Sequence, residues 1–168
     1  MARKYRVEIF YPLAVKEYPE QAIKELVEDL RPQDKLDLEA AAGSADFGIR
    51  QSIAFSDTVY FYYDDRGKCI SVLGLGQLEA SSLGRSIWSV STNEIEKGYV
   101  KSLLIKEAQY VVGMWALKHG LLQNIVNTEN EKSIHYMEKI LGAVFLPECI
   151  CANGHAWRPF YILPKGGE

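Results

Sequence analysis

The sequence predicts one α/β domain, of the α+β type, in which helices lie on the faces of a mixed sheet. The first observation is that short β-branched or aromatic runs alternate with amphipathic helical patterns along the chain. The second is the stretch 121–145 (LLQNIVNTENEKSIHYMEKILGAVF), which holds a strand, a capped helix, a glycine and a returning strand. The third is a length of 168 residues with no repeat or linker, which suits a single core spanning residues 1–168.

Composition and charge narrow the class of protein. The net charge is −3, whereas a dedicated nucleic-acid-binding domain shows a basic surplus, so we expect no direct nucleic-acid partner. No apolar run approaches the roughly 20 residues that span a bilayer, so we expect no membrane span. The first residues, 1–4 (MARK), lead into no apolar segment of a secretory signal. We therefore expect the protein to stay in the cytoplasm where it is made, or to be packaged from there.

The cysteine content bears on compartment and metal binding. Three cysteines, an odd number, indicate a reducing compartment rather than a disulfide framework. Cys149 and Cys151 share one face of a predicted strand and form a Cys-x-Cys-x-x-x-His group with His155. A zinc site usually takes four ligands with spacings of two to four residues. We therefore expect ordinary buried or half-buried thiols and no metal site.

The first part of the chain predicts a strand and two or three helices. Residues 5–10 alternate as a strand does, and Pro12 ends them. Residues 20–30 carry an apolar stripe typical of a helix. Residues 33–42, which follow a proline and precede a glycine, predict a second helix. Residues 46–55 are a candidate third helix.

A strand-rich section follows. Residues 58–63 and 68–76 form a predicted hairpin around an Asp-Asp-Arg-Gly turn, and residues 86–91 are a third strand. Aromatic side chains lie on both faces of 58–63, so this strand is either buried on both sides or presents one face as a contact surface. Gly74 and Gly76 share a face of their strand, which marks a bulge or a close approach to the backbone.

The last part alternates helices and strands. The predicted elements are, in order, a long helix, a strand, a short helix and two strands, over residues 100–118, 122–126, 131–141, 143–151 and 157–163. Gly142 ends the short helix, and the Asn153-Gly154 pair joins the last two strands. Pro159 cannot donate to a strand ladder, which favours an edge position for the last strand.

Two motifs in the stretch 121–145 carry a resemblance to a known family. They are the Asn-rich turn 127–130 and the helix end Tyr136-x-x-Lys139-x-x-Gly142. The stretch resembles the C-terminal half of a GNAT-type N-acetyltransferase, and the element order over residues 30–163 agrees with that fold. The resemblance implies a GNAT-like, mostly antiparallel mixed sheet with helices on both faces.

More narrowly, the sequence resembles the small internal virion proteins of short-tailed, coliphage-like podoviruses. The similar segments are Leu-Arg-Pro-x-Asp at 30–34, Leu-Gly-Ala-Val-Phe at 141–145 and Lys-Gly-Gly at 165–167. In that family the protein is associated with the internal core of the particle and with proteins ejected into the host, so the resemblance implies the same association here.

The GNAT resemblance also implies a cofactor loop. A working enzyme binds the diphosphate of acetyl-CoA with a Gln/Arg-x-x-Gly-x-Gly/Ala loop, where backbone N–H groups and the helix dipole hold the phosphates. The matching stretch, 91–101 (STNEIEKGYVK), has one glycine, Gly98. Glu94 and Glu96 would meet the diphosphate with like charge, which two nearby lysines soften. If acetyl-CoA binds, the contacts that the resemblance implies are Val90, Gly98, Lys101, Asn127 and Asn130.

The family's general acid is commonly a tyrosine in the short helix, which protonates the departing thiolate. Counted from the start of that helix, its position falls on Met137, and the neighbouring Tyr136 points about 100° away. Tyr136 is the candidate acid if the protein is active, and otherwise a half-buried aromatic. A base would then be sought at Glu79 or Glu94, near strand ends where a substrate would lie.

Two functions from different classes follow. The missing glycines and the displaced tyrosine favour a non-catalytic, virion-associated or assembly and ejection accessory protein, which needs no cofactor and binds other virion or ejection proteins. We expect such a protein in the host cytoplasm during assembly and inside the virion afterwards. The alternative is an acetyl-CoA-dependent N-acetyltransferase that acts on a host or phage target. Neither a P-loop nor a hydrolase nucleophile elbow is present in the sequence.

Overall fold

The computed structural model describes residues 5–15, 17–77 and 84–166. Contacts between residues divide the chain into two compact units. Unit 1 consists of Met1–Gln77 and Trp88–Leu104, and unit 2 of Leu78–Ile87 and Ile105–Glu168. The prediction of a single domain stays a prediction.

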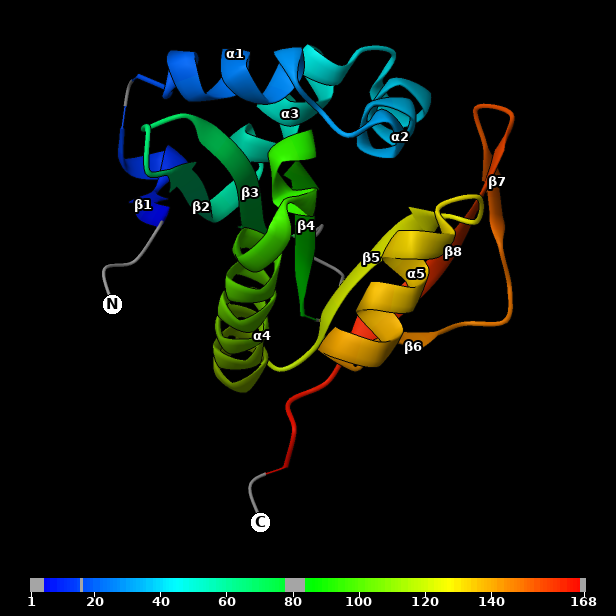
Figure 1. Cartoon of the computed structure of the whole chain (residues 1–168). Coiled ribbons are helices and arrows are strands. Elements are labelled where there is room, and N and C mark those ends of the chain that lie inside the picture. Colours follow the sequence, from blue (N-terminus) through cyan, green and yellow to red (C-terminus); the bar gives the residue numbers. More distant parts are fainter. Residues whose placement is uncertain (1–4, 16, 78–83, 167–168) are drawn as a thin grey trace. The chain divides into compact units, whose positions relative to one another are not determined.

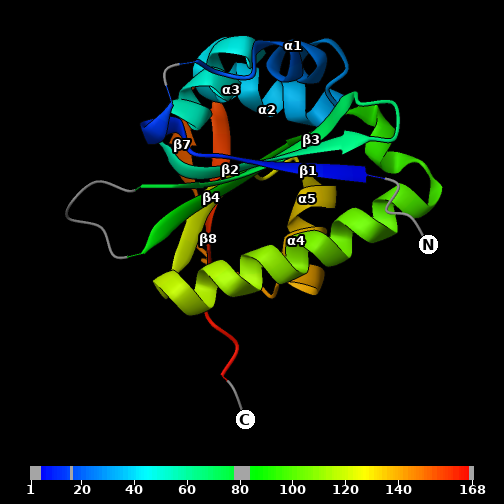
Figure 2. The same ribbon diagram turned by 90° about the vertical axis from the view of Figure 1, so that its left-hand side faces the viewer.

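Unit 1 is a set of paired strands with three helices gathered on one side (Figures 1 and 2). Its strand order is β1-β2-β3-β4, and β2 runs antiparallel to both β1 and β3. The strands are β1 (Tyr5–Phe10), β2 (Ser56–Asp64), β3 (Cys69–Gly76) and the end of β4 (Arg85–Ser91). The helices are α1 (Glu20–Glu28), α2 (Pro32–Ala42) and α3 (Ala45–Ala54), after a short 3-10 helix at Pro12–Ala14. These elements confirm the predicted order, including the third helix.

Helices α1 and α3 form because each offers an apolar face that the strands bury, whereas the one buried residue of α2 is Asp34 and its Leu38 is only partly buried against the same core. Ile23 and Leu26 of α1 and Ile49 of α3 are fully buried in one cluster with Phe61 of β2. Phe61 and its neighbour Tyr62 point to opposite faces of β2, and both are buried, at 1% and 3% exposure. Of the two alternatives for the aromatic strand, burial on both sides is therefore confirmed.

The glycine-rich strand β3 admits a close neighbour. A side chain at Gly74 would overlap the indole ring of Trp88 in β4. That ring is held in place because Trp88 Nε1 donates a hydrogen bond to Ser56 Oγ at 2.8 Å. The predicted close approach to the backbone of β3 is confirmed at Gly74.

Unit 2 has the strand order β4-β5-β8-β6, with β7 also paired to β8. The start of β4 runs parallel to β5 (Leu122–Asn127) through two residue pairs, and β5 runs antiparallel to β8 (His155–Ile162). The helices are α4 (Gly98–His119), which begins in unit 1, and α5 (Glu131–Tyr136). The long helix, the strand after it and the start of the short helix are as predicted.

Two predictions for the last strands are wrong. Residues 143–151 form two short strands, β6 (Val144–Phe145) and β7 (Ile150–Ala152), and both pair with β8. β8 is therefore not an edge strand, although it contains Pro159. The Pro159 carbonyl accepts a hydrogen bond from Leu146 N–H at 2.9 Å, so it points toward the side of β8 on which β6 and β7 lie. The nitrogen of Pro159 points to that side too, because the nitrogen and carbonyl of one strand residue point the same way. On that side β6 has ended and β7 has not begun, so the ladder needs no donor there.

The C-terminal hairpin turns at Asn153 and Gly154, which have φ values of 52° and 75°, as the Asn-Gly pair predicts. The thiols of Cys149 and Cys151 are exposed, not buried or half-buried as predicted, because the residues just before β7 and all residues of β7 are exposed. Within residues 5–15, 17–77 and 84–166, no helix is both long and apolar enough to cross a membrane. The predicted fold class, a mixed and mostly antiparallel sheet with helices, is confirmed.

Candidate functional site

The connection from β4 to α4 is a tight turn whose backbone is held to other parts of unit 1. Thr92 N–H donates to Ile70 O at 2.9 Å, and Asn93 N–H donates to Asp29 O at 3.0 Å. A single 3-10 turn, Asn93–Glu96, follows. These N–H groups are engaged by β3 and by the end of α1, so a ligand would have to bind farther along, at the start of α4.

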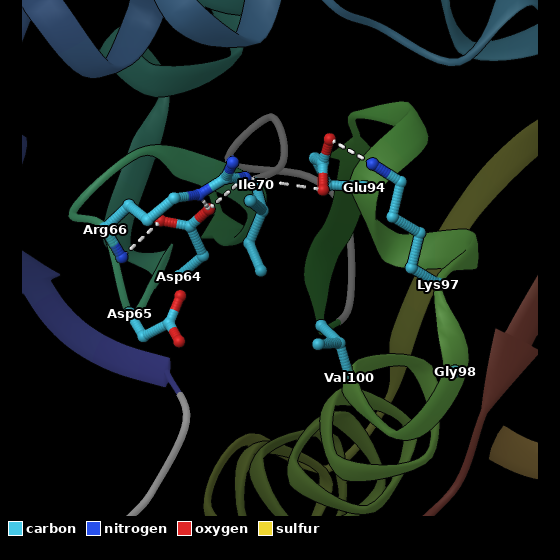
Figure 3. Close-up of a pocket in the computed structure, with 8 residues that line it drawn as sticks. All are labelled: Asp64, Asp65, Arg66, Ile70, Glu94, Lys97, Gly98 and Val100. Carbon is cyan, nitrogen blue, oxygen red and sulfur yellow. Dashed lines mark hydrogen bonds and ion pairs between the residues drawn. The ribbon is translucent and has the colours of Figure 1, made fainter.

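A cavity of about 300 Å³ lies beside this turn (Figure 3). Arg66 points into it from the β2–β3 turn, with its guanidinium 2.9 Å from the Asp64 carboxylate and 3.6 Å from that of Glu94. Lys97 Nζ lies 2.6 Å from the same Glu94 carboxylate. Both cations of the cavity are therefore engaged by carboxylates. The residues that line it are Asp64, Asp65, Arg66, Ile70, Glu94, Lys97, Gly98 and Val100.

Asp64 orients the Arg66 side chain. Its carboxylate accepts the backbone N–H groups of Arg66 and Lys68, each at 2.9 Å, as well as the guanidinium. Burial alone would raise the pKa of Asp64, but the hydrogen bonds from Lys68 and Arg66 outweigh it and hold the pKa below its usual range. Asp64 is therefore ionised at neutral pH and keeps Arg66 directed toward Glu94.

The other glutamate of the turn, Glu96, is also paired. Its carboxylate lies 2.8 Å from Lys101 Nζ and 3.8 Å from the Arg31 guanidinium. Gly98 opens α4 with φ of 51°, and no atom of the described residues beyond its two chain neighbours and the adjacent backbone of α4 lies within 4 Å of the position that a side chain would take there. The backbone at the start of α4 is thus open to an approaching group, while Lys101 and Lys97 are neutralised by the turn's own carboxylates.

The predicted cofactor contact Val90 does not present its side chain to a ligand. Val90 is 6% exposed and belongs to the core cluster of unit 1, and its carbonyl accepts a hydrogen bond from Ser71 Oγ at 3.3 Å. Glu79 lies outside the described residues.

The connection from β5 to α5 in unit 2 is built by two buried asparagines. Asn127, 2% exposed, accepts Glu129 N–H on Oδ1 at 3.0 Å. Asn130, 4% exposed, accepts Ser133 N–H on Oδ1 at 3.1 Å, which caps α5 as predicted. Both amide oxygens serve the turn itself.

The end of the short helix differs from the predicted regular helix. α5 ends at Tyr136 and continues as one π turn, Met137–Leu141, which is closed by a hydrogen bond from Gly142 N–H to Met137 O. Ala143 N–H donates to the same carbonyl at 2.9 Å. A π turn accommodates one extra residue, so positions counted from Asn130 and from Gly142 differ by one. The count from Asn130 runs through regular helix and falls on Met137, while Tyr136 beside it is half-buried.

The predicted residues thus fall into two groups. Glu94, Gly98 and Lys101 lie on the β4–α4 connection of unit 1. Asn127, Asn130 and Tyr136 lie on the β5–α5 connection of unit 2.

Prediction from sequence missed the two arginines that reach the β4–α4 turn. Arg66 lies in the predicted hairpin turn and Arg31 in the Leu-Arg-Pro-x-Asp segment, so each stood in a recognised feature. No sequence spacing connects them with Glu94 or Glu96, because the contacts are made between distant segments.

Comparison with known proteins supports the fold. No protein-family model matches the sequence, and no curated protein matches it. Among solved structures, the chain is similar to spermidine N-acetyltransferase from Vibrio cholerae in complex with CoA and spermine, with 12% identity, 97% of each chain covered and a TM-score of 0.62. It is also similar to IAA acetyltransferase from Bacillus cereus, with 15% identity, 95% of this chain and 99% of that chain covered, and a TM-score of 0.55. The GNAT-like fold is therefore confirmed.

Proposed function

We propose that the protein is an acetyl-CoA-dependent N-acetyltransferase. The observation that carries the proposal is the opening of α4 by Gly98, whose backbone has a φ of 51° and open space on its side-chain position. The first N–H groups of a helix have no partner within the helix and bind phosphate readily. The likeness of the fold to an acetyltransferase solved in complex with CoA supports acetyl-CoA as the cofactor, and the GNAT resemblance implies this helix end as the place of its diphosphate.

The residues around Gly98 fit a diphosphate after one exchange of partners. Lys97 would leave Glu94 and Lys101 would leave Glu96, and each lysine would then face a phosphate. The lysine side chains are 68% and 50% exposed, and exposed ion pairs contribute only about 0–1 kcal/mol each, so the exchange costs little. The bound cofactor would supply an activated acetyl thioester.

The reaction would be attack of an uncharged amine on the thioester carbonyl, with formation of a C–N bond and cleavage of the C–S bond. The amine nitrogen loses a proton and the departing thiolate gains one. The donor that the GNAT resemblance implies is Tyr136, which is half-buried at the end of α5 in unit 2, and solvent is the alternative donor. Glu94 is engaged by Lys97 and Arg66, so as a base it would first have to leave those partners.

A second function is favoured by the same turn. Paired glutamates at the helix start and Met137 in the acid position would suit a GNAT-like protein without catalysis. Its proposed role is that of a virion-associated or ejection accessory protein, as the podovirus resemblance of residues 141–145 implies. Its partners would be other virion proteins, and it would need no cofactor.

Calorimetry with acetyl-CoA separates the two functions. We expect the wild-type protein to bind, Gly98→Asp to lose binding through like charge at the phosphate position, and Gly113→Asp to retain it. Gly113 is a matched control because it lies in the same helix and also has open space around its side-chain position. Release of free thiol with a panel of amines then tests turnover.

Absence of both heat and thiol release in the folded wild-type protein would overturn the enzyme proposal. The accessory role would then be examined by mass spectrometry of purified virions. Peptides of this chain in the particles would support that role, and particles that lack it would exclude a packaged protein.

A further inference from the structure

The end of β4 is bonded to the segment that joins α1 and α2. Ser91, the last residue of β4, donates its N–H to Asp34 Oδ2 at 2.8 Å, and its carbonyl accepts Arg31 N–H at 3.0 Å. Beside this contact, Leu30 and Thr92 form an isolated antiparallel bridge. Both peptide groups of Ser91 are therefore taken by a segment that lies 57 residues away in the sequence at Asp34.

Asp34 is itself fixed by Arg31. The guanidinium donates from Nε at 3.0 Å and from Nη2 at 2.9 Å to the carboxylate, a two-pronged contact that restricts rotation of both groups. Asp34 is 5% exposed, and burial raises its pKa against the opposing attraction of Arg31. A buried ion pair of this kind is a weak source of net stability. Its main effect is to fix the positions of the Arg31 and Asp34 side chains and of the Ser91 N–H that Asp34 accepts.

The same arginine also reaches the turn. Nη1 of Arg31 lies 3.8 Å from the Glu96 carboxylate, and the Asn93 side-chain amide donates to Leu30 O at 3.3 Å. One guanidinium therefore joins the buried carboxylate that holds the end of β4 to the last residue of the 3-10 turn before α4.

We infer that Arg31 and Asp34 are positioning residues for the β4–α4 turn. They set where Ser91 and Glu96 lie, and so where the first N–H groups of α4 point. For its consequence on cofactor binding, the inference rests on the proposed function, because acetyl-CoA needs those N–H groups in a set place. The Leu-Arg-Pro-x-Asp segment acts through the turn and supplies no group to the cofactor.

Asp34→Asn tests the inference, because it replaces one accepting oxygen with an NH2 group that faces Arg31. Asp46→Asn is the matched control: Arg50 Nε binds Asp46 at 3.0 Å in the same unit, on the surface of α3. Hydrogen exchange at residues 91–96 should become about ten-fold faster in the Asp34 variant and stay unchanged in the control. Exchange in β2 should stay within about two-fold in both, whereas a merely structural role would speed β2 and the turn alike.

Titration with acetyl-CoA gives the functional readout. The Asp34 variant should bind about ten-fold more weakly than the wild type and the Asp46 variant equally well. If the wild type does not bind acetyl-CoA, the proposed function fails, while the exchange experiment still decides the positioning role.

Arg31→Lys is the second variant, for use if Asp34→Asn does not fold. It keeps the charge but loses the two-pronged contact, so exchange at residues 91–96 should become about three-fold faster with β2 unchanged. Turn exchange that stays at the wild-type rate in a folded variant of either kind would overturn the inference.

Discussion

The two turns that lead from a strand into a helix are built in opposite ways. The β5–α5 turn of unit 2 is neutral and local: Asn127 and Asn130 bond to backbone N–H groups two and three residues ahead. The β4–α4 turn of unit 1 is charged and non-local, with Ser91 bonded to Asp34 and Glu94 paired with Arg66. The first kind depends mostly on its own few residues, with one bond from Thr128 N–H to Ala156 O of β8 at 2.9 Å, whereas the second depends on several distant segments being folded.

The largest expected effect comes from a substitution in β3, which packs against β4 and so supports the charged β4–α4 turn without belonging to it. Gly74→Ala should destabilise the protein by about 2 kcal/mol, because the added methyl overlaps the Trp88 ring that packs on β3. Urea unfolding measures the loss, and hydrogen exchange should rise at residues 91–96 but not at residues 127–133. Gly113→Ala is the control: it has open space in a helix, so it should be neutral or slightly stabilising. If hydrogen exchange became faster by the same factor at residues 91–96 and at residues 127–133, the proposed difference between the two turns would be wrong.

The next effect concerns the charges of the β4–α4 turn. Glu94→Gln with Glu96→Gln should tighten acetyl-CoA binding by about ten-fold, because two carboxylates no longer compete with phosphate for the lysines and the helix start. The matched double variant, Glu28→Gln with Glu39→Gln, removes the same charge from two exposed helix pairs and should change affinity little. Calorimetry gives both values, and weaker binding by the first variant would show that the carboxylates assist the cofactor.

A smaller effect is expected at the neutral turn. Asn130→Ala should cost about 1 kcal/mol, because the cap of α5 loses its acceptor for Ser133 N–H. Asn130→Ser should restore most of this, since serine caps a helix about as well as asparagine. The change should appear in urea unfolding and in exchange at residues 131–134, with the β4–α4 turn unaffected. Failure of serine to rescue would mean that Asn130 acts through more than its cap.

The smallest expected effect is a pH dependence of the free energy of unfolding that comes from Asp64, next to the charged turn. Hydrogen bonds hold the pKa of Asp64 below its usual range, so its ionised form stabilises the folded state. Relative to Asp64→Asn, the wild type should be more stable by about 0.5 kcal/mol at pH values above the ordinary carboxylate pKa of about 3.9. This advantage should disappear as the pH falls through the lower folded-state pKa. Urea unfolding over a pH series measures it, with Asp65→Asn correcting for net charge, and an advantage that grows in acid would contradict the assignment.

What could be predicted from sequence follows the same division. The cap at Asn130, the stop at Gly142 and the Asn153-Gly154 turn are local features, and the structure confirms each. The predicted first helix, 20–30, is two residues longer than α1, which ends at Glu28. Leu30 is outside the helix because it forms a bridge with Thr92, a partner that no local pattern indicates.

The missed and mistaken features are non-local for the same reason. Arg66 reaches Glu94 only because the β2–β3 hairpin brings the two together. Pro159 signals an edge, and the structure places it at a gap between two short partner strands, which satisfies the same constraint in another way. The extra residue of the π turn changes no hydrophobic pattern, so periodicity did not reveal it.

The division of the chain into units has a consequence for synthesis on the ribosome. The chain passes from one unit to the other after Gln77, after Ile87 and after Leu104, so no single cut yields both units whole. A growing chain that ends near Gln77 has completed β1, β2 and β3, but β4, which pairs with β3, has not yet been made. Once β3 has emerged from the ribosome, it is an unpaired edge open to other nascent chains until β4 emerges as well. The delay between the emergence of β3 and that of β4 therefore sets how long β3 is at risk of misassembly.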